Sequence, residues 1–296
     1  MKALLTLLLF SAAPFATAGI DLRGNETPVH TPANPAAIAK IPPGYRFVAP
    51  GTLTVAISAL NSPPLALLAS DNRTRIGSDP DIARLLADSL GLKVKLVPTA
   101  WEEWPLGIAA GKYDVALVNI AVTEQRKTKF DFATYRVDTL GFSVKSTSDI
   151  QSINAPAEVA GRRVIVGSGT NQEKILLKWD RENQANGLKP VQPVYLTDDA
   201  SGNLYLQSGR ADAIFGPHSV GAYKAALTGK TRLVGKGPLK AYVATTTRKG
   251  NGLVFALQEA INGAIRGGQY QQVLTRWGEQ DEVVEASVVN PPGIAY

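Results

Sequence analysis

The chain contains no cysteine, a single methionine and only two histidines among its 296 residues. Without cysteine there is no disulfide framework and no thiol for a lipid anchor or a nucleophile. His30 lies in a proline-rich segment, which leaves His218 as the one candidate for a catalytic triad. Cysteine-histidine zinc sites are excluded too, and no Asp-rich loop matches an EF-hand. The sequence therefore predicts neither a metal site nor triad chemistry.

Two further kinds of ligand are excluded because their sequence patterns are missing. Residues 167–170 read Gly-Ser-Gly-Thr, without the lysine of a P-loop or the third glycine of a dinucleotide fingerprint. The formal net charge is +6, but the basic residues form no run interleaved with aromatic residues. The sequence therefore predicts no cofactor and no nucleic-acid partner.

Long apolar runs are also absent, since no segment is apolar over the about 20 residues that a membrane-spanning helix needs. A short apolar stretch at 3–10 follows Lys2 and precedes the small residues Ala-Thr-Ala at 16–18. This order is typical of a signal peptide, so we predict that residues 1–18 direct export and are removed. The alternative is an uncleaved N-terminal anchor.

Between two proline-containing ends lies a regular alternation of expected strands and helices. The ends, 19–50 and 279–296, lack periodicity and are predicted to be an extended N-terminal arm and a C-terminal tail. Asp79, followed by proline, is expected to be the N-cap of a helix that Gly91 ends. The alternation restarts after Gly161, so two α/β lobes are predicted. Strands are expected at 53–57, 94–97, 115–118, 164–166, 191–196 and 211–215.

The most informative arginine follows the strand at 115–118. Thr123 is expected to begin a helix in which Arg126 lies near the first backbone N–H groups. The guanidinium and the positive end of the helix then act on the same anion. This pattern predicts a receptor for the carboxylate of a small acid; the alternative is a surface arginine that pairs with Glu124.

Several motifs occur in an order that a known family shares. They are Gly-Ser-Asp-Pro-Asp at 77–81, Gly-Lys-Tyr-Asp-Val at 111–115, Thr-Glu-Gln-Arg at 123–126, Gly-Ser-Gly-Thr at 167–170, Gly-Arg-Ala-Asp-Ala at 209–213 and Arg-Trp-Gly at 276–278. From about residue 53 to 278 the chain resembles the periplasmic solute-binding proteins of the polar amino-acid-binding family. These are the receptors of ATP-driven (ABC) importers.

The resemblance implies the two-lobed α/β fold of periplasmic binding proteins, with a mixed sheet flanked by helices in each lobe. Lobe I is expected at 51–142 plus 243–278, and lobe II at 143–242. Two crossover strands, near 142–145 and 242–245, would act as the hinge on which the lobes close. The implied partners of this periplasmic, monomeric protein are a small carboxylate, such as an amino acid, and an inner-membrane ABC permease.

The same resemblance assigns roles to site residues. Arg126 would bind the ligand carboxylate, Thr170 and the amide of Gly169 would meet it from lobe II, and Trp101 would stack on the ligand. Thr170 as an ordinary helix start and Trp101 as a core residue stay open as alternatives. Further hydrogen bonds are expected from Asn61, Asn119, Asn171 and His218. His218 is equally expected as the first residue of a surface helix.

The chain departs from the family at Pro217, where amino-acid binders carry an aspartate that accepts the ligand's ammonium group. Enclosing an ammonium without a partner costs about 2 to 5 kcal/mol. We therefore expect a carboxylate whose other end is neutral, aromatic or otherwise placed. An amino acid is expected again if Asp198 or Asp199 reaches the cleft. Glu102 and Glu103 either receive a cationic ligand tail or lie on a solvated helix start.

One enzyme class stays open as an alternative. Cyclohexadienyl dehydratases share the exported two-lobed fold and carry a Gly-Thr-Asn-Glu sequence whose acid protonates a departing hydroxyl. In this chain Gln172 stands where that acid belongs, and Glu173 follows about 100° further round the helix. General-acid chemistry would require Glu173 to reach the pocket. A receptor without enzymatic activity is therefore expected.

Overall fold

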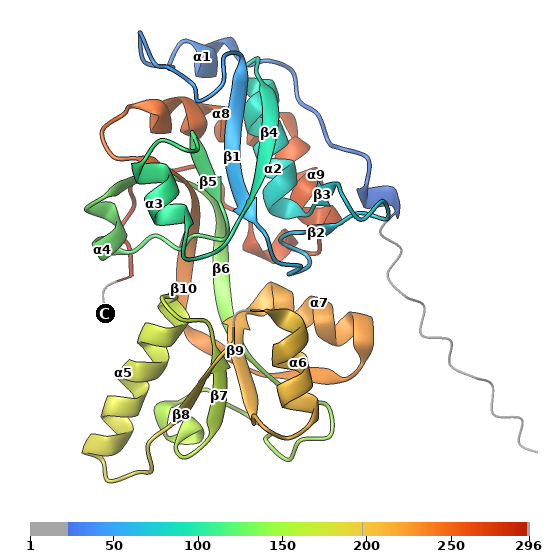
Figure 1. The fold of residues 1–296 in the computed structure, drawn as a ribbon, viewed down its shortest axis with the longest axis vertical. Helices are drawn as coiled ribbons and strands as arrows, with labels where there is room; N and C mark the ends of the chain where they lie inside the picture. The colour runs from blue at the N-terminus through green and yellow to red at the C-terminus, as the bar shows by residue number, and fades with distance from the viewer. Residues whose placement is uncertain (1–22, 197, 295–296) are drawn as a thin grey trace, which may run out of the picture.

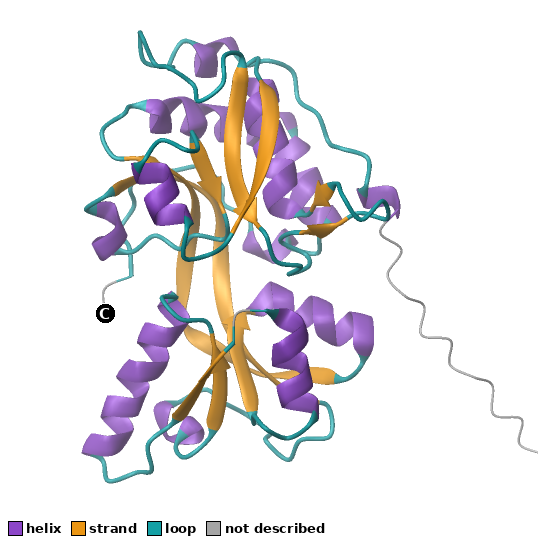
Figure 2. Cartoon of the chain, in the orientation of Figure 1, coloured by secondary structure: helices purple, strands orange, loops and turns teal. Residues whose placement is uncertain are grey.

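The computed structural model describes residues 23–196 and 198–294, except for the side chains of 23 and 236–239. The chain forms an upper and a lower lobe joined by two long strands, β6 and β10 (Figure 1). Figure 2 shows helices flanking the strands of both lobes. The predicted signal peptide, 1–18, lies outside the described residues.

The elements alternate along the chain much as the sequence predicts. The strands are β1 (Thr52–Ser58), β2 (Leu67–Leu68), β3 (Arg75–Ile76), β4 (Lys93–Thr99), β5 (Val115–Leu117), β6 (Phe130–Lys145), β7 (Arg163–Val166), β8 (Gln192–Tyr195), β9 (Ala213–Pro217) and β10 (Thr231–Arg248). The helices are α1 (Pro35–Ile38), α2 (Ser78–Ser89), α3 (Trp104–Ala109), α4 (Glu124–Lys127), α5 (Asn171–Ala185), α6 (Asp199–Gln207), α7 (His218–Thr228), α8 (Leu253–Gly267) and α9 (Gln269–Arg276). Short 3-10 helices are η1 (Arg23–Asn25), η2 (Pro156–Val159) and η3 (Gln280–Glu282).

Eight strands form one mixed sheet in the order β4-β1-β5-β10-β6-β9-β7-β8. In the upper lobe β1 is parallel to β4 and β5, and in the lower lobe β7 is parallel to β8 and β9. The two linking strands are antiparallel to each other, and β6 is also antiparallel to β9. The predicted α/β fold with mixed sheets is therefore confirmed.

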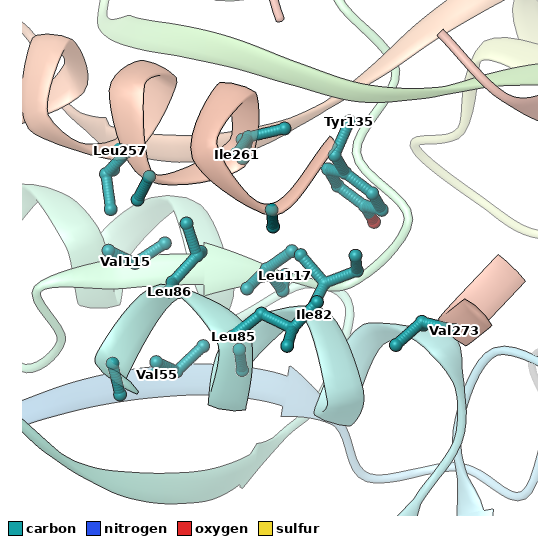
Figure 3. Packing of buried hydrophobic residues seen from close by; sticks show 14 of the residues in the cluster. Val55, Ile82, Leu85, Leu86, Val115, Leu117, Tyr135, Leu257, Ile261 and Val273 are labelled. Atoms are coloured by element: carbon teal, nitrogen blue, oxygen red, sulfur yellow. The ribbon is translucent and has the colours of Figure 1, made fainter. Parts of the chain in front are cut away.

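The upper lobe buries apolar side chains on both faces of its strands. Val55 of β1 and Val115 of β5 belong to a cluster under α2, α8 and α9 (Figure 3). The alternate residues Ala56 and Ala116 belong to a second cluster, which contains Trp104 of α3. This alternation follows from the two-residue period of a strand. Helices therefore cover the strands from both sides.

The lower lobe has its own core, built around stacked aromatic rings. Phe142 lies parallel to Phe215, with ring centroids 4.2 Å apart, and Trp179 of α5 stacks on the pair. Along β6 the change from the upper to the lower core falls between Val137 and Leu140. The strand thus passes between the lobes a little before the crossover expected at 142–145.

The N-terminal segment was predicted to be an extended arm. In the structure it contains the short helix α1 and packs on the upper lobe. Asn34 caps α1 by accepting the N–H groups of Ala36 and Ala37, and the side chain of Ala37 is fully buried. Lys40 forms an ion pair with Glu259 of α8 at 2.9 Å. The C-terminal tail also lies on this lobe, where Asn290 exchanges hydrogen bonds with the backbone of Phe132.

Within the described part of the chain, we find no helix with the length and apolar character needed to cross a membrane.

Candidate functional site

A cavity of about 240 Å³ is lined by residues from both lobes. The upper lobe contributes Ser58, Leu60, Ser62, Leu65, Asp79, Thr99, Trp101, Val118 and Asn119. The lower lobe contributes the turn at 166–168, the start of α5 and residues of α6, α7 and β9. The two lobes that β6 and β10 join thus supply opposite walls of one cavity.

Asn119, one of the predicted site residues, is held at the end of β5 in a left-handed conformation with φ of 54°. Its backbone N–H donates to Asp79 Oδ2 at 3.1 Å, and its Nδ2 donates to Asp138 Oδ2 at 3.3 Å. Its Oδ1 accepts from the guanidinium of Arg136. Asn119 therefore reaches the cavity from a position fixed on three sides.

Asp79 does not cap α2, contrary to prediction. The helix begins two residues earlier than expected, at Ser78 with Gly77 as its N-cap, and the Asp79 carboxylate accepts the Tyr135 hydroxyl at 2.5 Å. A side chain at Gly77 would lie 2.3 Å from the carbonyl oxygen of Leu65, so the loop after β1 passes very close. Burial raises the pKa of Asp79 above its ordinary value.

Behind this wall, one buried arginine holds a group of acids together. Arg136 is fully buried, donates to Glu282 of η3 and lies 3.6 Å from Glu279. Asp138, in the stretch of β6 between the lobes, is also buried, and no hydrogen-bond partner for its Oδ1 lies among the described residues. Burial raises the pKa of Asp138 to about 7 and that of Glu279 to about 8. The region behind the cavity therefore favours neutral carboxyl groups or an additional cation.

Arg126 lies beside the cavity rather than in its wall. Its backbone N–H is capped by Thr123 Oγ1 at 3.1 Å, and its guanidinium donates to the carbonyl oxygen of Ala121 at 2.9 Å. The guanidinium carbon lies 5.2 Å from the ring centroid of Trp101, which lines the cavity. The structure thus joins two predicted site residues in a cation-π contact.

The turn before α5 forms the lower rim. Thr170 caps the helix by accepting the N–H of Glu173 at 3.1 Å, as the helix-start interpretation requires, and it lines the cavity. Gly169 has a φ of 71°, and its N–H donates to the Glu173 carboxylate at 2.6 Å. A ligand carboxylate at this amide would therefore displace Glu173. Asn171 and Gln172 line the cavity, whereas Glu173 does not.

The other two predicted residues lie away from the cavity lining. Asn61 accepts the backbone N–H of Leu68 at 3.2 Å and so stabilises the loop after β1. His218 is the first residue of α7, as the alternative interpretation has it. Of the eight predicted residues, the structure brings Trp101, Asn119, Thr170 and Asn171 to the cavity wall.

Sequence reasoning missed a charged pair in the lower wall. Asp199, at the start of α6, and Lys224 of α7 form an ion pair at 2.5 Å, and both line the cavity. Asp198 lines it as well. The two aspartates had been named with their position left open. Lys224 gave no signal, because its cavity-facing position depends on how α7 packs against α6.

The lobes touch across one side of the cavity. Lys174 of α5 donates to Gln125 of α4, and an added Cβ at Gly169 would lie 3.7 Å from Trp101 Nε1. Among residues 23–196 and 198–294, no group of three or more His, Asp or Glu side chains is arranged to hold a metal ion.

A cavity enclosed by two lobes on two linking strands is the geometry of a solute receptor, and a comparison with protein families agrees. Residues 53–280 match the profile of the bacterial extracellular solute-binding proteins, family 3. The chain belongs to this family. The resemblance seen in the motifs is thereby confirmed.

The similar proteins include solute-binding proteins and one enzyme. The chain is similar to the L-cystine-binding protein TcyJ of Escherichia coli K12, with 28% identity over 230 residues, covering 77% of this chain and 82% of that protein. It also resembles the solved structure of an ancestral arginine-binding protein bound to glutamine, with 26% identity, a TM-score of 0.69, and coverage of 78% and 99%. A cyclohexadienyl dehydratase of Pseudomonas aeruginosa is 28% identical over 142 residues, 46% of this chain and 48% of that enzyme.

Proposed function

We propose that this family 3 protein is the exported receptor of an ABC importer and captures an amino acid or a related small carboxylate between its lobes. The observation that carries the proposal is the cavity, since its walls come from both lobes and the lobes are joined by β6 and β10. Closure of such lobes on a ligand is a hinge motion in which a few strand residues change conformation. The proposed location is the periplasm, and the proposed partner of this monomer is an inner-membrane ABC permease.

The acids in the cavity wall support a ligand with an ammonium group. Pro217 lines the cavity at the position where an aspartate was expected, but Asp198 and Asp199 line it from the start of α6. The condition under which an amino acid becomes the expected ligand is thus met. The names of the relatives, an L-cystine-binding protein and an arginine-binding protein bound to glutamine, agree with this choice.

We propose further that the protein does not act as a dehydratase. Glu173 accepts the amide of Gly169 and lies outside the cavity lining, while Gln172, an amide without an acidic proton, lines it. General-acid chemistry has no donor at that position. Prephenate should stay unconverted by the protein; conversion that Glu173→Gln abolishes would overturn this part of the proposal.

Thermal unfolding of the mature protein with single ligands tests the binding function. L-glutamine, L-arginine and L-cystine are compared with glutarate and other carboxylates of similar length without an amine. A ligand at about 100 times its Kd should add about 2.7 kcal/mol to the free energy of unfolding. Stabilisation by amino acids supports the proposal, and stabilisation by the amine-free acids alone would show that the aspartates do not take an ammonium. If neither class stabilises the protein, the receptor function is wrong.

A further inference from the structure

A buried carboxyl group lies where β6 passes from one lobe to the other. Val137 packs against the upper core and Leu140 belongs to the lower core, and Asp138 lies between them with 2% of its surface exposed. The pairing of β6 with β10 is irregular close to this point, since the register shifts between Lys236 and Lys240. Figure 1 shows these two strands running from the upper to the lower lobe. Asp138 therefore lies on the hinge about which the lobes would close.

Asp138 belongs to a group of buried acids that share one cation. Asp79 of α2, Glu279 just before η3 and Glu282 at the end of η3 are also buried, and we call these four residues the hinge acid cluster. Arg136 is fully buried beside them, donates to Glu282 and lies 3.6 Å from Glu279. Four carboxyl groups of the described chain thus surround a single guanidinium.

This imbalance of charge favours a bound proton in the hinge acid cluster. Asp138 Oδ1 has no hydrogen-bond partner among the described residues, and Ala241, which pairs with Asp138 from β10, is uncharged. Burial raises the pKa of Asp138 to about 7, against the opposing effect of Arg136, and burial raises that of Glu279 to about 8. Because interacting acids titrate together, the proton belongs to the cluster rather than to one residue.

The hinge acid cluster meets the cavity at two residues. Asp79 lines the cavity itself. Asn119 lines it too, and its Nδ2 donates to Asp138 Oδ2 at 3.3 Å while its backbone N–H donates to Asp79 Oδ2 at 3.1 Å. A unit charge about 10 Å from a carboxylate, at an effective dielectric constant of about 20, changes the proton affinity of that carboxylate roughly 10-fold. A charge inside the cavity therefore changes how tightly the cluster holds its proton.

We propose that ligand capture is linked to proton release at the hinge. The hinge acid cluster holds a proton in the unliganded receptor, and the ammonium group of an amino acid that enters the cavity drives this proton into the solvent. The inference rests on the proposed receptor function and adds a regulation to it, because ligand affinity then depends on the pH outside the protein.

The direction of the effect follows from the charges around the cavity. An amino acid would turn its ammonium toward the acids of the walls, Asp79 above and Asp198 and Asp199 below, and its carboxylate toward Arg126 beside Trp101. The positive group stabilises the ionised cluster, so the complex binds fewer protons than the free receptor. The association constant should therefore rise with pH across the interval near pH 7 in which the cluster titrates.

Calorimetric titration in two buffers of different ionisation enthalpy, HEPES and Tris, measures the number of protons exchanged. The strongest binder among L-glutamine, L-arginine and L-cystine is titrated at pH 7. The wild-type protein should release up to about one proton per ligand, and its association constant should be about 3- to 10-fold higher at pH 8 than at pH 6. Equal binding enthalpies in the two buffers, or proton uptake, would overturn the proposal.

Asp138→Asn removes a titrating carboxyl group but keeps an oxygen that can accept from Asn119. It should lose most of the proton release and of the pH dependence. Asp212→Asn is the matched control, because it removes an aspartate charge that pairs with Arg163 at 2.6 Å outside the cavity lining. Both variants keep the two histidines and bind the same ligand, so equal proton release in both would assign the proton to those groups and overturn the proposal.

Glu279→Gln is a second cluster variant, which takes the place of Asp138→Asn if that protein does not fold or does not bind. It should also release fewer protons than Asp212→Asn. Unchanged release would overturn the role of the hinge acid cluster, while the receptor function would stand. Failure of all three amino acids to bind would contradict the receptor function itself.

Discussion

The guanidinium of Arg126 lies over the indole of Trp101, with 5.2 Å between the guanidinium carbon and the ring centroid. A second tryptophan, Trp104, lies 5.8 Å from the same carbon. The arginine expected to bind a carboxylate is thus placed by aromatic rings, and one of these rings forms the wall of the cavity. Changes at either residue should therefore affect the ligand site through the other.

Replacing Arg126 tests its predicted role as the carboxylate receptor. Arg126→Met should weaken amino-acid binding by about 30-fold or more, because a charge-assisted contact contributes about 2 kcal/mol or more. Calorimetric titration measures the loss. Lys127→Met is the control variant. It also removes one positive charge from α4, but Lys127 pairs with Glu124 and is not predicted to contact the ligand. Equal losses in the two variants would mean that net charge, rather than a specific contact, explains the effect.

The buried arginine of β6 should be important for stability. Arg136→Met leaves several buried acids without their common cation and should lower the free energy of unfolding by about 3 to 5 kcal/mol. Arg163→Met breaks a partly exposed pair with Asp212 and should cost no more than about 1 kcal/mol. Urea unfolding of both variants gives the comparison. A small effect of Arg136→Met would show that the acids are already neutral at the pH of the experiment.

Stability should depend on pH through Asp138. Its folded-state pKa, about 7, is above that of an exposed aspartate, so the folded state binds more protons between about pH 4 and 7. The contribution is therefore full at low pH and is lost as the pH rises through 7. Asp138→Asn cannot ionise, so the difference in stability between variant and wild type should shift in favour of the variant between pH 5 and 8. Chemical unfolding of both proteins at pH 5 and pH 8 measures this difference. If the free energies of unfolding of variant and wild type change equally with pH, the prediction is wrong.

The C-terminal tail should stabilise the segment that carries Arg126. Asn290 has φ of 48°, and its side chain accepts the N–H of Phe132 and donates to Asp131. Asn290→Gly keeps this backbone conformation accessible but removes both hydrogen bonds, at a cost of about 1 to 3 kcal/mol. Thermal unfolding should show the loss, and ligand affinity should fall with it. Unchanged stability would mean that the tail packs independently of that side chain.

Much of the fold could be predicted because its signals are local. The apolar run at 53–57 became β1, and Gly91 follows the last turn of α2. Asp79 was assigned wrongly, because the local sequence, an acid followed by a proline, is the same whether the acid caps a helix or accepts a hydrogen bond from a distant tyrosine. The tyrosine in question, Tyr135, is 56 positions away. Contacts at such separation leave no trace in the local pattern.

The site was harder to predict than the fold, for a similar reason. Thr170 follows from its place at a helix start, which a turn motif indicates. The facing of Lys224 toward Asp199 depends on the packing of two helices on the lower sheet, and no spacing in the sequence encodes it. The family pattern, with its aspartate replaced by Pro217, even pointed away from acids in the wall. Their position emerged once the helices were placed.

The tail contacts also set an order of events during synthesis. Gly293 donates to Glu124, 169 positions earlier in the chain, and the backbone of Ile294 exchanges hydrogen bonds with Val122 and Glu124. The helix of Arg126 is made when less than half of the chain exists, yet its supporting residues come after both lobes are complete. A chain released before residue 290 would hold every predicted ligand contact but lack the support of α4. The segment that carries Arg126 is therefore fully supported only after the last residues of the chain have been made and have packed on the upper lobe.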